Sequence, residues 1–230
     1  MSIAEKFEVI ADEVYEKGKE YIWEVVQQGG ARTDYREAFV MWDMDYIHPK
    51  YKVTPIADYS GYLTFSNSKI KKIEKEYFDF SQKISTSNIQ SGWYYTFSGC
   101  NYLEEVEDIG MQAMINYSYT FAWCYNLHTI AIIRTDENTS WGSTFTACSN
   151  LQNITIEGVI GKSGFSVKDC KRLTKESLLS ILRALSKDST VASGKSITFA
   201  AAHQEVIESD AECLEQLNLA VNAGWTIAYA

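Results

Sequence analysis

Residues 93–106 read WYYTFSGCNYLEEV, and this stretch recurs without gaps as YSYTFAWCYNLHTI at 117–130 and as WGSTFTACSNLQNI at 141–154. The shared pattern is aromatic-x-[Tyr/Ser]-Thr-Phe-x-x-Cys-x-x-Leu-x-x-[Val/Ile]. Each anchor returns after 24 residues; the anchors are Phe97, Phe121 and Phe145, then Cys100, Cys124 and Cys148, then Leu103, Leu127 and Leu151. Because Phe and Cys are rare, their recurrence in fixed register indicates an internal repeat.

Weaker copies flank the three clear ones. Val167, Cys170 and Leu173 form a degenerate fourth copy, in which the cysteine step shortens to 22 residues. An eroded earlier copy begins at Thr64-Phe65, where Ile70 and Ile73 take the apolar positions. The sequence therefore predicts a repeat region over residues 60–173.

A period in the low twenties, with a Leu-x-x-Ile-x-Ile run at Leu127–Ile132 and again at Leu151–Ile156, fits one short strand and one return segment per turn of chain. We call each such turn a rung. Successive strands then stack in parallel about 4.8 Å apart, so equivalent residues form ladders of Phe and of Leu/Ile inside the stack. A single rung leaves its apolar faces uncovered and could not fold alone.

The Phe-x-x-Cys-x-x-Leu-x-x-Ile signature resembles the BspA-like leucine-rich repeats of bacterial surface and phage-associated proteins, although it lacks the Ile-Pro that often follows the strand. More widely, the chain resembles uncharacterised leucine-rich repeat proteins of Firmicutes and their prophages. Those proteins share an opening helix, a segment like Gln27–Tyr35 leading to Pro49-Lys50-Tyr51, and an ending like Leu173–Leu185 closed by Gly224–Ile227. The resemblance implies an α/β leucine-rich repeat solenoid with stacked parallel strands. It implies no defined activity.

The first 59 residues are expected to form an N-terminal helix and capping region. Ile3, Phe7, Ile10 and Val14 follow one another at steps of four, three and four residues, which is a heptad-like spacing. Two interpretations stay open: a coiled coil that makes a homo-oligomer, or a helix that covers the first rung.

Residues 174–230 are expected to form a helix-strand cap that continues the solenoid. Thr174 precedes a helix with apolar positions from Leu178 to Leu185, and strands are predicted at Lys195–Phe199 and Trp225–Tyr229. A helix from about Ser209 to Asn222 lies between those strands, stopped by Gly224, with Cys213, Leu214, Leu217 and Val221 on its buried face. This order favours strands that extend the parallel sheet and seal its edge.

Composition excludes several classes of partner. The chain has 230 residues, 46% hydrophobic content and a formal net charge of -9, with a pI of about 4.9. Nucleic acid and anionic membranes require a basic surface, so neither is an expected partner. Charges interrupt the first residues, Met1 to Glu8, and no window approaches the ~20 apolar residues of a membrane span. We expect no signal peptide and synthesis in the cytoplasm, and association with a virion stays open as an alternative.

The repeat cysteines are better explained as buried packing residues than as metal ligands or reactive thiols. The five cysteines include no Cys-x-x-Cys pair, and four of them follow the repeat phase. Stacked thiolates could bind a soft metal, but a phase-locked Cys is explained as a small buried filler. His48, His128 and His203 stand in no triad or metal motif, and no phosphate-binding glycine loop occurs. We expect neither cofactor nor metal, and no enzymatic activity.

Aromatic side chains are the candidates for binding. Trp93, Tyr117 and Trp141 lie four residues before each Phe, and Tyr95 and Tyr119 lie two before it. Strict alternation would bury these with the Phe and turn Thr96, Thr120 and Thr144 outward; an exposed column instead requires a turn before the Thr. Tyr94, Tyr102, Trp123 and Tyr125 break the phase and are better surface candidates.

The sequence thus favours a non-enzymatic module that binds a protein or a cell-surface glycan through the side of its solenoid. The alternative is a structural, tail-associated or spacer protein that oligomerises through its N-terminal helix.

Overall fold

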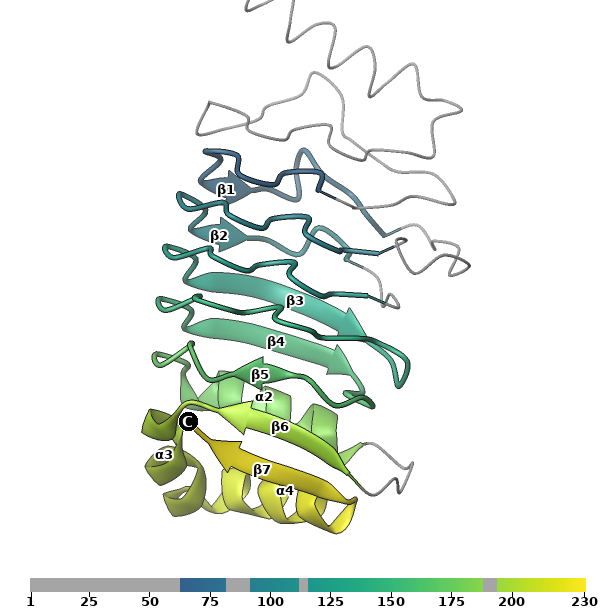
Figure 1. The fold of residues 1–230 in the computed structure, drawn as a ribbon, viewed down its shortest axis with the longest axis vertical. Coiled ribbons are helices and arrows are strands. Elements are labelled where there is room, and N and C mark those ends of the chain that lie inside the picture. Colours follow the sequence, from purple (N-terminus) through teal and green to yellow (C-terminus); the bar gives the residue numbers. More distant parts are fainter. Residues whose placement is uncertain (1–62, 82–91, 112–115, 188–193) are drawn as a thin grey trace, which may run out of the picture.

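The computed structural model describes residues 63–81, 92–111, 116–187 and 194–230, which form a stack of chain turns with helices at its C-terminal end (Figure 1). Within these ranges the strands form two parallel sheets, in the orders β1-β2-β3-β4 and β5-β6-β7. The strands are β1 Lys72–Ile73, β2 Glu105–Val106, β3 Thr129–Thr135, β4 Asn153–Gly158, β5 Ser166–Val167, β6 Lys195–Phe199 and β7 Trp225–Tyr229. The helices are α2 Lys175–Ser186, the 3-10 turn η1 Ala201–His203, α3 Gln204–Ser209 and α4 Ala211–Asn222.

Residues at equivalent positions of the sequence repeat lie beside one another in the structure. Ile73 pairs with Val106, Val106 with Ile130, and Ile130 with Ile154, so equivalent positions of successive copies lie side by side in the sheet. The return segments are joined as well: the backbone N–H of Phe65 donates to the carbonyl of Thr96 at 2.8 Å, that of Phe97 to Thr120 at 2.9 Å, and that of Phe121 to Thr144 at 3.0 Å. The rungs that carry β1 to β4 are therefore bonded to one another both through their strands and through their return segments.

The core contains the predicted ladders. Rings of Phe65, Phe97, Phe121 and Phe145 stack in sequence with centroid separations of 5.2, 5.3 and 6.0 Å. The repeat leucines are buried beside them, and so are the apolar residues of the two weak copies: Leu103, Leu127, Leu151, Ile70, Ile73, Val167 and Leu173. One detail differs in β3, where a bulge between Ile130 and Ile133 makes Ile133, not Ile132, the partner of Ile156.

The repeat cysteines are buried, and they also link the rungs. The thiol of Cys100 donates to the carbonyl of Phe65 at 2.9 Å, Cys124 to that of Phe97 at 3.0 Å, and Cys148 to that of Phe121 at 3.0 Å. Cys170 and Cys213 are buried too, and all five are free thiols. The small side chain thus fits the filler interpretation and adds a weak hydrogen bond along the stack.

Each return segment contains two residues in the left-handed region, placed two before and two after the repeat Phe. The first set is Leu63, Tyr95, Tyr119 and Ser143, with φ of 55 to 57°; the second is Asn67, Gly99, Trp123 and Ala147, with φ of 56 to 72°. These turns rotate the side chains between them, so strict alternation does not apply. The expected outward Thr ladder is accordingly wrong: Thr96, Thr120 and Thr144 are buried.

The buried threonines satisfy backbone carbonyls within the turn. The hydroxyl of Thr120 lies 2.6 Å from the carbonyls of both Trp93 and Tyr117, and that of Thr144 lies 3.0 and 2.8 Å from those of Tyr117 and Trp141. The Thr of the repeat is therefore a structural hydrogen-bond donor.

The C-terminal helices and strands form where the sequence predicts them, but they join the stack differently. Thr174 caps α2, Asp210 caps α4, and Gly224 with φ 94° precedes β7. However, β6 and β7 do not extend β1–β4; they pair with β5 on the side of the return segments, while α2 and α4 continue the side of the strands (Figure 1). On α4, Cys213 is buried as expected, but Leu214 and Val221 are exposed.

The open edge of β4 is sealed by serine side chains of α2. Ser177 accepts from the backbone N–H of Ile154 at 3.0 Å, and Ser180 accepts from that of Ile156 at 2.8 Å. The edge is thus covered by a helix, not by a further strand.

The predicted N-terminal region, residues 1–59, with its heptad-like helix and the coiled-coil interpretation, lies outside the described residues. In the ranges that are described, no helix is both long and apolar enough to cross a membrane.

Candidate functional site

The exposed aromatic side chains gather on the return segments of two neighbouring rungs. Of the six predicted binding residues, Tyr102, Tyr125 and Trp123 are exposed, with 50, 46 and 39% of their surface accessible, and Tyr94 is half-buried. Tyr95 and Tyr119, also half-buried, contact Tyr94 and Trp123. We call these six the aromatic face: Tyr94, Tyr95, Tyr102, Tyr119, Trp123 and Tyr125.

The remaining two predicted binding residues, Trp93 and Trp141, are core residues, so their assignment to a ligand surface is wrong. They are 0 and 1% exposed. Trp141 stacks on Tyr117 at 5.2 Å and meets Phe165 edge-on at 4.9 Å, while Trp93 meets Phe80 edge-on at 5.1 Å. The regular column four residues before each Phe is therefore a second internal ladder, although a left-handed residue does precede each Thr, at Tyr95, Tyr119 and Ser143.

Strict alternation would bury Tyr95 and Tyr119, but the chain turns at these residues, as the alternative interpretation required, and both are half-buried at the surface. Their rings stack face to face at 4.6 Å with an interplanar angle of 4°, and Tyr94 meets Tyr95 edge-on at 4.6 Å. A signal was present in the sequence: the equivalent positions hold Leu63 and Ser143, a variety that a buried ladder position would not accept. The stacked pair holds this end of the face rigid.

Trp123 combines exposure with an unfavourable backbone. Its φ is 62°, at a position where neighbouring rungs carry Asn67, Gly99 and Ala147. A left-handed conformation costs an L-residue about 1–2 kcal/mol, and glycine or asparagine adopts it most readily. A large aromatic side chain that remains 39% exposed is a poor occupant of this position on folding grounds alone.

Tyr102 and Tyr125 lie where the return segments bend toward the strands. The side-chain amide of Asn126 donates to the carbonyl of Asn101 at 2.8 Å, and that of Asn150 donates to the carbonyl of Tyr125 at 2.7 Å. These bonds tie each bend to the next rung. The backbone that presents the two tyrosines is thus held in place before any ligand arrives.

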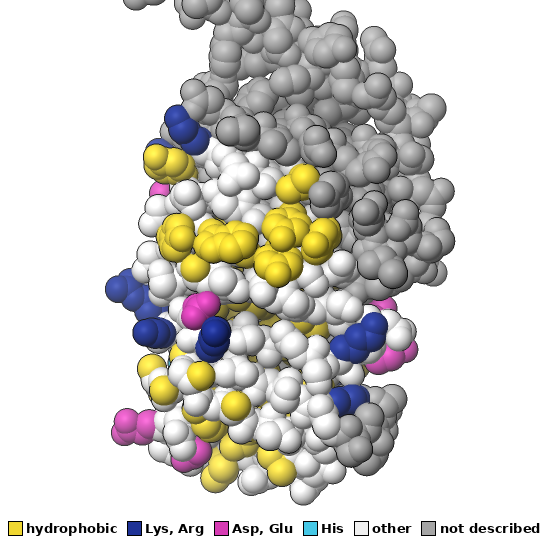
Figure 2. Space-filling view, in the orientation of Figure 1, with side chains coloured by type: hydrophobic (Ala, Val, Ile, Leu, Met, Phe, Trp, Pro, Cys, Tyr) yellow, Lys and Arg dark blue, Asp and Glu magenta, His cyan; other side chains and the backbone are white. Residues whose placement is uncertain are grey.

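The residues of the next rung that are equivalent to the aromatic face are small and uncharged, although the carboxylate of Asp169 accepts there from the N–H of Ala147 at 2.9 Å. At the positions equivalent to Tyr119, Trp123 and Tyr125, the next rung carries Ser143, Ala147 and Ser149. Figure 2 shows a band of hydrophobic side chains crossing this side of the molecule, with charged side chains at its margins. The face is therefore a raised aromatic band beside a lower polar rung.

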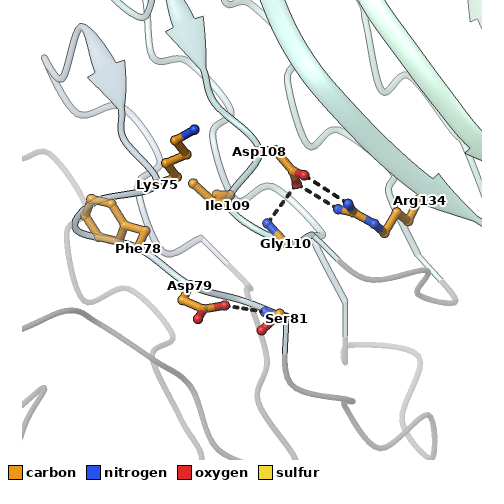
Figure 3. Close-up of a pocket in the computed structure, with 8 residues that line it drawn as sticks. All are labelled: Lys75, Phe78, Asp79, Ser81, Asp108, Ile109, Gly110 and Arg134. Carbon is orange, nitrogen blue, oxygen red and sulfur yellow. Dashed lines mark hydrogen bonds and ion pairs between the residues drawn. The ribbon is translucent and has the colours of Figure 1, made fainter.

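A separate pocket of about 550 Å³ lies at the other end of the rungs, lined by Lys75, Phe78, Asp79, Ser81, Asp108, Ile109, Gly110 and Arg134 (Figure 3). Its main charges are already paired: Arg134 donates to both carboxylate oxygens of Asp108 at 2.8 and 3.0 Å and lies 3.3 Å from Glu157. The hydrogen bonds from Arg134 lower the pKa of Asp108. The carboxylate of Asp108 also accepts from the N–H of Gly110 at 3.1 Å. These contacts clamp three successive rungs and leave little capacity for a ligand.

The nucleophilic and titratable groups of the core are poorly suited to chemistry. Burial raises the pKa of the Cys100 and Cys148 thiols to about 12 and that of Cys213 to about 11. Burial likewise lowers the pKa of His203, which is 2% exposed. Among the residues that the structure describes, no group of three or more His, Cys, Asp or Glu is placed to hold a metal ion.

Comparison of the chain with family models, with curated proteins and with solved structures finds no match. The functional argument therefore depends on the geometry of the aromatic face.

Proposed function

We propose that this chain is a leucine-rich-repeat-type solenoid that serves as a non-enzymatic recognition module and binds a protein or a cell-surface glycan through the aromatic face. The observation that carries this proposal is Trp123, an exposed ring on a left-handed backbone position. Neither core packing nor backbone preference favours Trp at this position, whereas ligand contact would.

The composition of the face supports recognition. It combines Tyr and Trp rings with the Asn, Ser and Gly residues of adjacent turns, which is the residue set that antibody binding loops use. Such rings provide a large contact area with few rotatable bonds, and Trp and Tyr are the residues most often found to dominate binding energy.

Solenoid architecture is supported by the 24-residue register of the strands and by the hydrogen bonds between return segments. Stacked repeats form extended, rigid surfaces on which neighbouring rungs contribute to one site. The setting that we propose is a bacterial or prophage surface, which follows from the resemblance of the repeat signature to proteins of that origin. The buried thiols with raised pKa support a non-enzymatic role.

Sedimentation of the full chain with isolated cell envelopes of Gram-positive bacteria tests the proposal. We expect saturable binding that weakens at least tenfold in Trp123→Ala and in Tyr125→Ala. The matched control is Leu219→Ala, which removes an exposed apolar side chain of α4, an element that contributes nothing to the aromatic face. Equal binding by all four proteins, or no binding, would overturn the assignment of function to this face.

A further inference from the structure

We propose that the ligand of the aromatic face is an uncharged glycan, bound as an extended chain of pyranose rings across the rung 117–130. This inference rests on the proposed function and names its ligand class.

Charge separates this class from polyanions. None of the six residues of the aromatic face is charged, and neither are Gly142, Ser143, Ala147 and Ser149 on the adjoining rung. The chain as a whole carries a formal charge of -9. Single-stranded nucleic acids also stack on aromatic rings, but their binding sites add a positively charged groove that follows the phosphates. An acidic glycan would likewise meet no cation in the face, so a neutral ligand fits best.

The kind of apolar surface separates a glycan from a protein partner. On the described return segments the exposed large hydrophobic residues are Tyr102, Trp123 and Tyr125, whereas the exposed Val and Leu residues lie on α3 and α4. The buried centres of protein interfaces combine aromatic residues with Met and Arg. Aromatic ring faces carry negative charge density, which attracts the polarised C–H groups on one side of a pyranose ring. The hydroxyl groups at the sugar's edge can hydrogen-bond to the Asn, Ser and Tyr groups that surround the rings.

The order of the rings along one turn of chain sets the direction of the ligand. Tyr119, Trp123 and Tyr125 follow one another within a single rung, so they form a row across the stack. Tyr119 stacks face to face on Tyr95 at 4.6 Å and lies nearly parallel to Trp123, with ring centroids 6.1 Å apart. Tyr119 therefore supports Trp123, and the exposed rings of Trp123 and Tyr125 are the ones that successive sugars of an extended chain can meet.

The residues of the neighbouring rungs that are equivalent to Trp123 are small. The positions equivalent to Trp123 hold Gly99 on one side and Ala147 on the other, so no side chain longer than a methyl group flanks the indole along the stack. Gly99 is itself constrained, because its φ is 72° and an added Cβ would lie 2.2 Å from the side-chain oxygen of Asn67. The bound chain can accordingly lie against Trp123 without obstruction from adjacent turns.

The test is binding of the full chain to immobilised neutral hexasaccharides of β-1,4-glucan, β-1,3-glucan, α-1,4-glucan and β-1,4-mannan, with polygalacturonate as the anionic comparison. We expect saturable binding to at least one neutral hexasaccharide. Trp123→Ala and Tyr125→Ala should weaken it at least tenfold, Trp123→Phe should retain affinity within about threefold because it keeps a ring, and Leu219→Ala should bind as wild type. The affinity should also be unchanged by added salt, since no ion pair is involved. Binding to none of the neutral glycans, or binding to polygalacturonate alone, would overturn the inference.

Treatment of the cell envelopes distinguishes failure of this inference from failure of the proposed function. Periodate cleaves 1,4-linked hexoses at their vicinal C2 and C3 hydroxyls, β-1,3-glucanase hydrolyses the 1,3-linked glucan that lacks such a diol, and protease removes surface proteins. We expect periodate together with the glucanase to abolish envelope binding and protease to leave it intact. Envelope binding that requires Trp123 but is lost with protease and survives periodate together with the glucanase would retain the recognition function and overturn the glycan. Absence of envelope binding would overturn both.

Discussion

Substitution of Trp123 by Gly and by Ala measures how much the backbone at the centre of the aromatic face is strained. Both variants remove the same ring and differ only at the Cβ atom, so their difference in stability isolates the backbone contribution. At φ 62°, Ala retains the left-handed cost of about 1–2 kcal/mol. Gly avoids that cost but loses about 0.5–1 kcal/mol more conformational entropy on folding. We therefore expect Trp123→Gly to be more stable than Trp123→Ala by about 0.5–1 kcal/mol.

The assay is thermal or urea unfolding of the two variants beside a control pair at an ordinary helical position. Leu219 in α4 is exposed and helical, so Leu219→Gly should be less stable than Leu219→Ala by about 1 kcal/mol. For a chain of this size the expected differences are each on the order of 1–4 °C in Tm. The two pairs thus differ in sign.

A Trp123→Gly variant less stable than Trp123→Ala would refute the reasoning, because it would show that Trp123 does not have a left-handed backbone. The argument that this ring is retained for a ligand would then lose its basis. If the sign is as expected, both Trp123 variants should still lose binding equally. The two variants would then differ in stability but not in binding, because binding depends on the ring that both lack. This is the result expected for a residue that is retained for function at some cost in stability.

Three further predictions concern the stack itself. With a thiol reagent at about pH 8, the native chain should show no rapidly reacting cysteine and the denatured chain should show five. Burial blocks access to the thiols, and a pKa of about 12 instead of 9.0 lowers the thiolate fraction of Cys100 and Cys148 about a thousandfold. Rapid labelling of either cysteine in the native chain would contradict this prediction. Thr120→Val should lower the free energy of unfolding by about 1–3 kcal/mol through lost bonds to two carbonyls, whereas Thr146→Val, at a half-buried position, should change it by less than about 0.5 kcal/mol; similar losses would place the Thr120 hydroxyl elsewhere. Burial lowers the pKa of His203 in the folded state, so below about pH 6.5 the unfolded state binds the proton more readily. The free energy of unfolding should therefore fall from about pH 6.5 toward pH 5, with a slope of up to about 1.4 kcal/mol per pH unit. In urea titrations His203→Leu should flatten that slope, and an unchanged slope would exclude His203 as its source.

The sequence predicted the elements of the C-terminal end more accurately than their partners. Thr174 and Gly224 are local signals that act within a few residues, and both the helix they begin and the strand they precede are present. Whether Trp225–Tyr229 would pair with β4 or form another sheet depends on which surface α2 covers. That choice is made by Ser177 and Ser180, which contact β4 from a helix about 24 residues further along the chain. No local pattern encodes such a contact.

The exposure of the candidate binding residues was also predicted only in part. Tyr102, Trp123 and Tyr125 depart from the repeat, and their exposure was predicted correctly on that basis. Alternation places Trp93 and Trp141 in the core, where they are, so their assignment to a ligand surface failed because it set alternation aside. For Tyr95 and Tyr119 alternation fails, because both residues have left-handed backbones in a segment that is not a strand.

The sequence by itself determined the register of the repeat, that is, which Phe, Cys and Leu residues lie beside their equivalents in the next rung. It therefore also determined that short parallel strands stack about a buried core. The reason is that a repeat of constant length places identical side chains at identical heights, where each rung covers the apolar face of the next. Only the tertiary structure decided which residues that follow the repeat face outward from the return segments, as Tyr95 and Tyr119 do and Trp93 and Trp141 do not. Two left-handed residues per rung rotate the side chains there, and those turns are stabilised by hydrogen bonds to the neighbouring rung, between residues about 24 positions apart, which no single rung contains.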